Sequence, residues 1–175
     1  KAIVHILNEN TVWNTLIISP PGFGKTTLLK DIIKKISNGI PEFNFKGVTC
    51  GVVDERGELS ATYKGISQND LGIRTDVIDN IPKALGMKML IRSMSPKVII
   101  ADEIGKKEDV DAIEYAVTSG VKGIFTAHGS DLEQIEHNPI LNQLIINGYI
   151  EKVLAMDKQR NVHLLYEKQS KRKVS

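Results

Sequence analysis

The stretch from Ile18 to Thr27, ISPPGFGKTT, constrains the fold of this chain more than any other feature. It follows an apolar run at residues 14–19, which is typical of a buried strand, and from Lys25 onward apolar residues recur at helical spacing. A strand, a glycine-containing turn and a helix N-terminus in this order bind phosphate, because backbone N–H groups and the helix dipole then point at one anion. The sequence therefore predicts a P-loop, a nucleotide-binding loop, in an α/β domain.

The loop departs from the pattern G-x-x-x-x-G-K-[ST] at one position, where Ser19 replaces the first glycine. That glycine only starts the turn, so a serine can replace it if its φ stays negative. Lys25 is expected to reach the outer phosphates and Thr26 to ligate Mg²⁺. The alternative is a glycine–proline turn before a lysine-rich helix. The predicted ATP-binding residues are Ser19, Pro20, Pro21, Gly22, Phe23, Gly24, Lys25, Thr26 and Thr27.

An acidic pair follows another apolar run, VIIADE at residues 98–103. Asp102 and Glu103 would stand at the carboxyl end of a buried strand, where open α/β sheets place their ligands. We expect Asp102 to hold Mg²⁺ through water and Glu103 to take a proton from the attacking water. The alternative is that Asp-Glu marks only the start of a helix.

The segment FTAHGSD at residues 125–131 ends the next predicted strand. The side chains of Thr126 and His128 could there approach the γ-phosphate from the side. His128 is predicted to donate a hydrogen bond to that phosphate and to report hydrolysis, and the alternative is an ordinary loop histidine.

A further acidic pair, Asp54 and Glu55, ends the strand predicted for GVTCGVVD. These carboxylates could orient the water or bind Mg²⁺ indirectly, or they could be solvated turn residues. An additional strand between the P-loop strand and the acidic strand suits the RecA-like ATPases, in which a glutamate is the base.

Two arginines are candidates for completing the site of a neighbouring subunit. ATPases that act as rings commonly borrow an arginine, and Arg74 and Arg92 flank the acidic strand in sequence. The alternative is a salt bridge to Asp76, Asp79 or Glu103.

Apolar strands alternating with helices predict a mostly parallel sheet covered by helices on both faces. Residues 55–79 are expected to form a functional loop, and Ser130 with Glu133 a capping box for a helix. A strand pair within residues 150–167 would close the sheet. We expect one ATPase domain at residues 1–168, a basic disordered tail at 169–175, and further protein before Lys1, since no initiator methionine is present.

Composition narrows the function classes. The net charge is +2 and aromatic residues make up 5%, which leaves few stacking platforms for nucleic acid. The lone Cys50 excludes an internal disulfide and fits a reducing, cytoplasmic setting. No apolar run approaches the roughly 20 residues of a membrane helix, and no N-K-x-D motif for reading guanine occurs.

Two segments, RSMSPKVIIADEIG and TAHG, resemble the secretion-ATPase superfamily. The segments NTLIISPPGFGKTTLLKDI, VVDERGEL, GIRTDV, PKALGMKMLIRSMSP and FTAHG together resemble, more closely, the stage III sporulation protein AA family. This resemblance covers residues 14–167. It implies a Mg²⁺-dependent ATPase that forms a homo-hexamer and docks at a membrane channel between mother cell and forespore, on the mother-cell side.

The chain departs from the wider superfamily at two places. Most secretion ATPases have glycine where Asp102 stands, so they do not support its Mg²⁺ role, and they have Arg-Asp where Gly105 and Lys106 stand. The rival functions are a RecA-like motor stimulated by nucleic acid and a scaffold that binds ATP without hydrolysing it.

Overall fold

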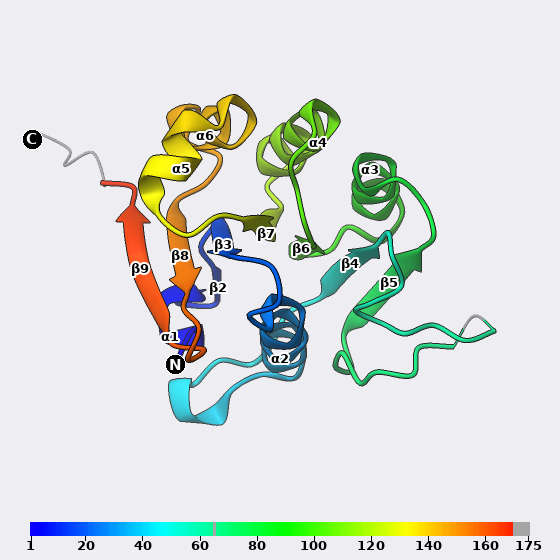
Figure 1. The fold of residues 1–175 in the computed structure, drawn as a ribbon. Coiled ribbons are helices and arrows are strands. Elements are labelled where there is room, and N and C mark those ends of the chain that lie inside the picture. Colours follow the sequence, from blue (N-terminus) through cyan, green and yellow to red (C-terminus); the bar gives the residue numbers. More distant parts are fainter. Residues whose placement is uncertain (65, 170–175) are drawn as a thin grey trace, which may run out of the picture.

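A seven-stranded sheet forms the centre of the computed structural model, which describes residues 1–64 and 66–169 (Figure 1). The strand order is β5-β4-β6-β7-β3-β8-β9, and only β9 runs antiparallel to its neighbour. The strands are β3 (Thr15–Ser19), β4 (Cys50–Asp54), β5 (Thr75–Asp79), β6 (Val98–Ala101), β7 (Lys122–His128), β8 (Lys152–Met156) and β9 (Val162–Glu167). The predicted mostly parallel α/β sheet is confirmed.

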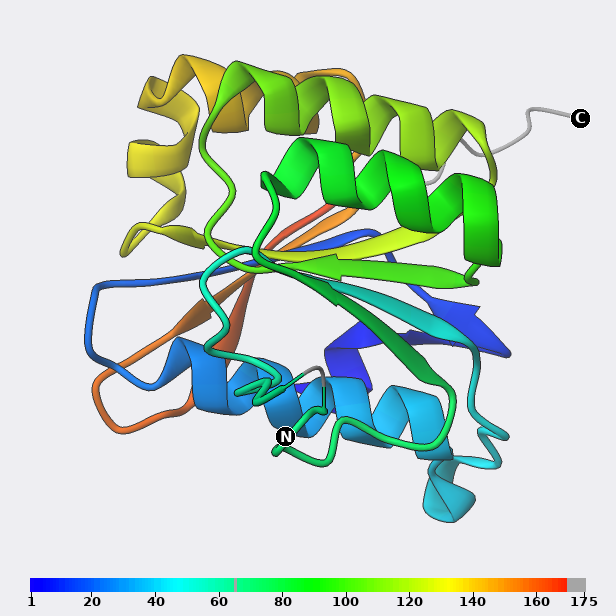
Figure 2. The ribbon, with the colours of Figure 1, turned by 90° about the vertical axis from the view of Figure 1, so that its right-hand side faces the viewer.

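Helices cover both faces of the sheet, as predicted (Figure 2). On one face lie α1 (Ile3–Ile6) and α2 (Lys25–Asn38), and on the other lie α3 (Lys83–Met94), α4 (Lys107–Thr118), α5 (Leu132–His137) and α6 (Pro139–Ile146). The remaining short elements are β1 (Leu7–Asn8), β2 (Thr11–Val12) and the 3₁₀ turn η1 (Pro41–Phe43).

Two apolar layers separate the sheet from its helices. Strand β3 is buried along its whole length, and its alternate side chains enter opposite layers: Leu16 packs below α4 and α6, and Ile17 packs against α2. Continuous apolar strands are the expected signature of a parallel sheet buried on both faces. This burial fixes where β3, β6 and β7 end, and therefore where the polar residues that follow them lie.

The strand between the P-loop strand and the acidic strand is β7. In sequence β4 intervenes, but in the sheet it lies beyond β6, next to β5. The carboxyl ends of β3, β7, β6 and β4 therefore lie side by side, in that order, along one end of the sheet. The segments that follow these strands lie at the same end.

Two local predictions were wrong. Strand β5 lies within residues 55–79, predicted as a loop, because an edge strand that is only partly buried tolerates the aspartates that suggested a loop. The N-cap of α5 is Asp131, whose carboxylate accepts the backbone N–H of Gln134, and the predicted cap Ser130 lies one residue earlier.

The hairpin predicted at residues 150–167 is present as β8 and β9. Most of the predicted basic tail, residues 170–175, lies outside the described residues.

Candidate nucleotide-binding site

The P-loop connects the buried end of β3 to the first residue of α2. Gly22 and Gly24 have φ values of 80° and 92°, a region that glycine occupies at little cost. Ser19 is buried and is not among the described residues with positive φ, which meets the condition for a serine at this position. Backbone N–H groups around such turns form an anion-binding concavity, here next to a helix N-terminus.

Lys25, at the start of α2, is buried and points toward the end of β7. Its Nζ donates to the carbonyl oxygen of Ala127 at 3.3 Å and lies 3.4 Å from Nδ1 of His128. Burial lowers the pKa of Lys25, an effect opposed by Asp102 and Glu103 and reinforced by Arg56. The site therefore holds a desolvated cation for which a bound anion would be a favourable partner.

The hydroxyl of Thr26 connects the P-loop to the acidic strand. Thr26 Oγ1 donates to Asp102 Oδ2 at 3.2 Å, and the hydroxyl of Thr126 on β7 donates to Asp102 Oδ1. A hydroxyl and a carboxylate oxygen that face one another are the hard oxygen ligands that Mg²⁺ prefers. The two residues predicted to hold Mg²⁺ are thus together, and their chemistry fits that ion.

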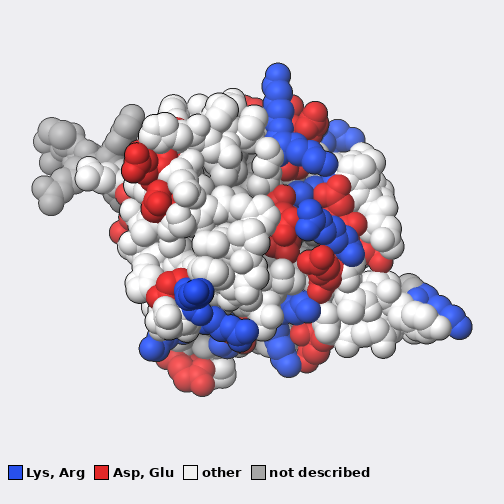
Figure 3. All heavy atoms as spheres, viewed as in Figure 1, with Lys and Arg blue, Asp and Glu red and all other residues white. Residues whose placement is uncertain are grey.

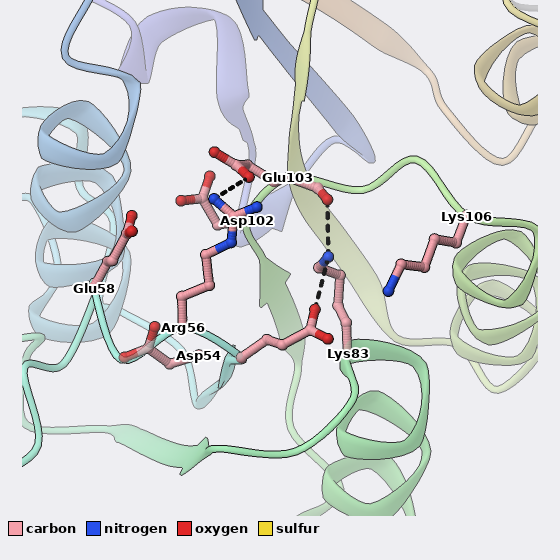
Figure 4. Close-up of a pocket in the computed structure, with 8 residues that line it drawn as sticks. Asp54, Arg56, Glu58, Lys83, Asp102, Glu103 and Lys106 are labelled. Atoms are coloured by element: carbon pink, nitrogen blue, oxygen red, sulfur yellow. Dashed lines mark hydrogen bonds and ion pairs between the residues drawn. The ribbon is translucent and has the colours of Figure 1, made fainter. Parts of the chain in front are cut away.

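Glu103 follows Asp102 in an unusual backbone conformation, with a φ of 53°. Its N–H donates to Thr126 Oγ1 at 2.8 Å. Its carboxylate lies 2.7 Å from Nη1 of Arg56 (Figure 4), and 3.7 Å from Nε2 of His128. His128 therefore lies between Lys25 and Glu103. The side chains predicted as phosphate ligand, sensor and base are brought to one place.

A pocket opens beside this acidic pair, between the loop after β4 and the start of α3 (Figure 4). In Figure 3, basic and acidic side chains are intermingled over this part of the surface. The pocket is lined by Asp54, Glu55, Arg56, Glu58, Lys83, Asp102, Glu103 and Lys106.

Asp54 and Glu55 have different surroundings. Asp54 is buried, and its carboxylate accepts the backbone N–H groups of Leu59 and Ser60 and the Ser60 hydroxyl. It therefore anchors the loop after β4 and is not a solvated turn residue. Glu55 lines the pocket and pairs with Lys83 at 3.1 Å.

Arg74 and Arg92 lie away from the site of their own chain. Arg74 directly precedes β5, so it lies at the amino ends of the strands, away from the carboxyl ends that form the site. Its guanidinium donates to the carbonyl of Ser37 at the end of α2. Arg92, in the last turn of α3, contacts the ring and hydroxyl of Tyr115. In the described part of the chain neither forms the salt bridge considered as the alternative.

Sequence reasoning missed three cations, two beside the acidic pair and one beside the P-loop. Arg56 lies inside the motif VVDERGEL, in which only the acidic residues were predicted to act. Lys83 begins α3, where a cation opposes the helix dipole, and that mismatch was a usable signal. Arg160, in the β8–β9 turn, lies against Gly24, and only the folded hairpin brings it there.

Comparison with solved structures assigns the fold to a known class. The structure is similar to the ATPase DotB of Legionella pneumophila, with a TM-score of 0.61 and 18% identity, covering 93% of this chain and 46% of that one. It is also similar to the pilus retraction motor PilT, solved with bound ADP, with a TM-score of 0.62 and 15% identity, covering 90% and 48%. The chain therefore has the RecA-like fold of the secretion ATPases, as predicted.

Within that class the chain belongs to the family described as Sporulation stage III, protein AA, whose model matches residues 1–173. Stage III sporulation protein AA of Bacillus subtilis (strain 168) is 42% identical over 171 residues, covering 96% of this chain and 55% of that protein. Protein SEEDLING PLASTID DEVELOPMENT 1 of Arabidopsis thaliana is 30% identical over 146 residues, covering 82% of this chain and 20% of that protein. The family resemblance read from the sequence is confirmed.

The chain spans about half, or less, of the length of these curated relatives. Among the described residues, no helix is both long and apolar enough to cross a membrane.

Proposed function

We propose that this chain is the ATP-hydrolysing domain of a ring-forming motor that serves a secretion-type channel complex. The observation that carries the proposal is the hydrogen bond between Thr26 and Asp102, because it joins the P-loop to the acidic strand and leaves Glu103 beside the junction. Family membership and the motor proteins among the structural neighbours support it.

The residues take the following roles. The P-loop N–H groups and Lys25 bind the phosphates, and Thr26 and Asp102 hold Mg²⁺, which supplies charge neutralisation at the phosphate oxygens when bound. Glu103 accepts the proton of the attacking water. His128, within reach of both Lys25 and Glu103, responds to the presence of the terminal phosphate.

The proposed assembly is a homo-hexamer in the cytoplasm, peripheral to a membrane and bound to channel proteins there, on the mother-cell side. Membership of the sporulation stage III, protein AA family and the similarity to the Bacillus subtilis protein support the sporulation setting. The whole motor would include segments beyond this chain.

The test is Mg²⁺-dependent ATP turnover of the full-length protein across a range of concentrations, with mass photometry of the same samples. Turnover per subunit should rise as rings form. Glu103→Gln should keep ATP affinity and lose at least ~10²-fold in turnover, the usual scale for removing a general base. Equal losses of binding and turnover would make Glu103 structural and leave Glu55 as the next candidate base.

A second candidate is a scaffold that binds ATP without hydrolysing it. The ion pair between Arg56 and Glu103 favours it, because the Glu103 carboxylate must separate from the guanidinium before it can accept a proton from water. A full-length ring that binds ATP tightly and turns it over no faster than its Glu103→Gln variant would establish this second function.

A further inference from the structure

Lys83 is a buried cation in an unfavourable position. It is the first residue of α3, follows the N-cap Pro82, and is only 7% exposed. The helix dipole disfavours a positive charge at this end, and burial disfavours any charge without a partner. The described part of the chain contains two other buried lysines, Lys25 in the P-loop and Lys152 on β8.

The side chain of Lys83 has two partners, and both belong to the pocket beside the acidic pair (Figure 4). Its Nζ donates to the backbone carbonyl oxygen of Glu103 at 2.8 Å and pairs with Glu55 Oε2 at 3.1 Å. Lys83 therefore joins three parts of the pocket: the start of α3, the loop after β4, and Glu103, the second residue after β6.

The contact falls on the backbone of Glu103, whose φ is 53°. For a residue with a Cβ, this left-handed region costs roughly 1–2 kcal/mol, so it persists where neighbouring contacts impose it. The Glu103 N–H is held by the Thr126 hydroxyl, and the next N–H, of Ile104, donates to the Thr126 carbonyl. Lys83 holds the carbonyl between these two amides.

We infer that Lys83 is a positioning residue for the catalytic carboxylate. By holding the carbonyl of Glu103, it fixes the left-handed backbone that directs the carboxylate toward Arg56 and His128 and away from α3. Glu55 is then the counter-ion that keeps Lys83 charged and oriented, and it acts through Lys83 instead of on the water. This inference rests on the proposed role of Glu103 as the base.

Catalytic geometry is sensitive to such contacts, since a misplacement of about 1 Å can cost ~10²-fold in rate. Binding of ATP depends on the P-loop, which Lys83 does not contact. Loss of Lys83 should therefore affect kcat and leave KM and ATP affinity nearly unchanged. A purely structural role would instead lower stability without this separation.

The experiment compares Lys83→Met, Lys83→Arg, Glu55→Gln and the control Lys152→Met in the full-length protein. Lys152 is the matched control, because it is also a buried lysine paired with a carboxylate, that of Glu167. It begins β8 and pairs with Thr15 at the start of β3, so it lies at the amino ends of the strands, away from the site. Each variant is measured for kcat, KM, ATP affinity with a fluorescent analogue, melting temperature, and hydrogen exchange of the peptide that spans residues 102–106.

Lys83→Met is expected to lower kcat by ~10- to 100-fold with ATP affinity within about threefold of wild type. It should also speed hydrogen exchange at residues 102–106. Lys83→Arg, which retains a cationic donor, should recover part of the kcat, and Glu55→Gln should lower kcat less than Lys83→Met does. Lys152→Met should change neither kcat nor that exchange.

The inference is overturned if Lys83→Met keeps wild-type kcat, or if exchange at residues 102–106 stays at the wild-type rate. Should Lys83→Met fail to fold, Glu55→Gln decides, and wild-type kcat in that variant counts against the inference. A wild-type protein without Mg²⁺-dependent turnover contradicts the proposed function instead, and the exchange measurement then still tests whether Lys83 holds the backbone of Glu103.

Discussion

Arg56 Nη1 lies 2.7 Å from Glu103 Oε2, so the proposed base is already paired with a cation of its own chain. The Arg56 side chain is 64% exposed, and an ion pair this accessible to water is worth at most about 1 kcal/mol. The pair therefore restrains Glu103 only weakly, and a competing anion could displace it.

We expect Arg56→Gln to raise basal ATP turnover, by no more than ~5-fold, because Glu103 is then free to accept a proton. Steady-state turnover below the concentration at which rings form measures this. Lys34→Gln, which removes the exposed ion pair with Asp70 away from the site, is the control for loss of an exposed paired cation. A fall in turnover for Arg56→Gln would instead assign Arg56 to the charge that develops on the phosphate.

Lys25 gives a prediction in which binding and stability move in opposite directions. Burial lowers the pKa of Lys25 in the folded protein, so the charged lysine costs folding free energy at neutral pH. Lys25→Met should abolish ATP binding, measured by calorimetry, while the melting temperature without nucleotide is unchanged or higher. Lys30→Met, elsewhere on α2, serves as the control.

The contribution of Lys25 to folding stability depends on pH with a definite sign. Between the lowered folded pKa of Lys25 and its unfolded value of 10.5, the unfolded state binds more protons, so stability rises with pH. The stability advantage of Lys25→Met over wild type should therefore shrink as the pH approaches 10.5.

A wild-type ATP affinity in Lys25→Met would reject the P-loop assignment.

The substitution Gly24→Ala tests whether the backbone conformation of the P-loop serves ATP binding. Its φ is 92°, and a Cβ there would lie 3.2 Å from Nε of Arg160 in the β8–β9 turn. Gly24→Ala should lower stability by ~1–2 kcal/mol and weaken ATP binding, because the alanine strains the left-handed turn and displaces the arginine.

The control for Gly24→Ala is Gly120→Ala. Gly120 follows α4, has a φ of 78°, and would place its Cβ in open space. It should show a similar loss of stability in chemical denaturation and no change in ATP affinity. Equal ATP affinities for the two variants would mean that the conformation of Gly24 does not serve binding.

His128 is expected to contribute more to turnover than to affinity. One neutral hydrogen bond is worth about 1 kcal/mol, so His128→Ala should hold ATP within roughly tenfold of wild type and lose more than that in turnover. His137→Ala, on exposed α5, is the control. Wild-type turnover of His128→Ala in the full-length ring would return His128 to the role of an ordinary loop residue.

The sequence identified the residues that end buried parallel strands, because the apolar runs predict the strands and the topology class places their ends together. Asp102, Glu103 and His128 were predicted to lie together in this way, and Lys25 was predicted from the P-loop pattern. Glu55 was found too, but its partner was not, since the contact with Lys83 depends on how α3 packs beside β4. Arg160 reaches Gly24 only through the hairpin fold, which local spacing cannot reveal. Strand β5 was missed because its alternation is weak at the sheet edge.

Arg74 and Arg92 remain the candidates for an arginine supplied to a neighbouring subunit. Each lies away from the site of its own chain, so any contact with nucleotide would have to be across a subunit boundary. An arginine supplied in this way can be worth 10³-fold or more in rate. The alternative roles seen within the chain are the end of α2 for Arg74 and Tyr115 for Arg92.

The test mixes two inactive full-length proteins, one carrying Glu103→Gln and the other Arg74→Ala or Arg92→Ala. In a mixed ring, some interfaces pair an intact glutamate with an intact arginine of the neighbour, and we expect ATP turnover to return in part for one of the two. The control mixes Glu103→Gln with Lys25→Met, since both defects lie within one site and no interface regains a complete set. If mass photometry shows mixed rings and neither arginine variant recovers, both arginines act only within their own chain.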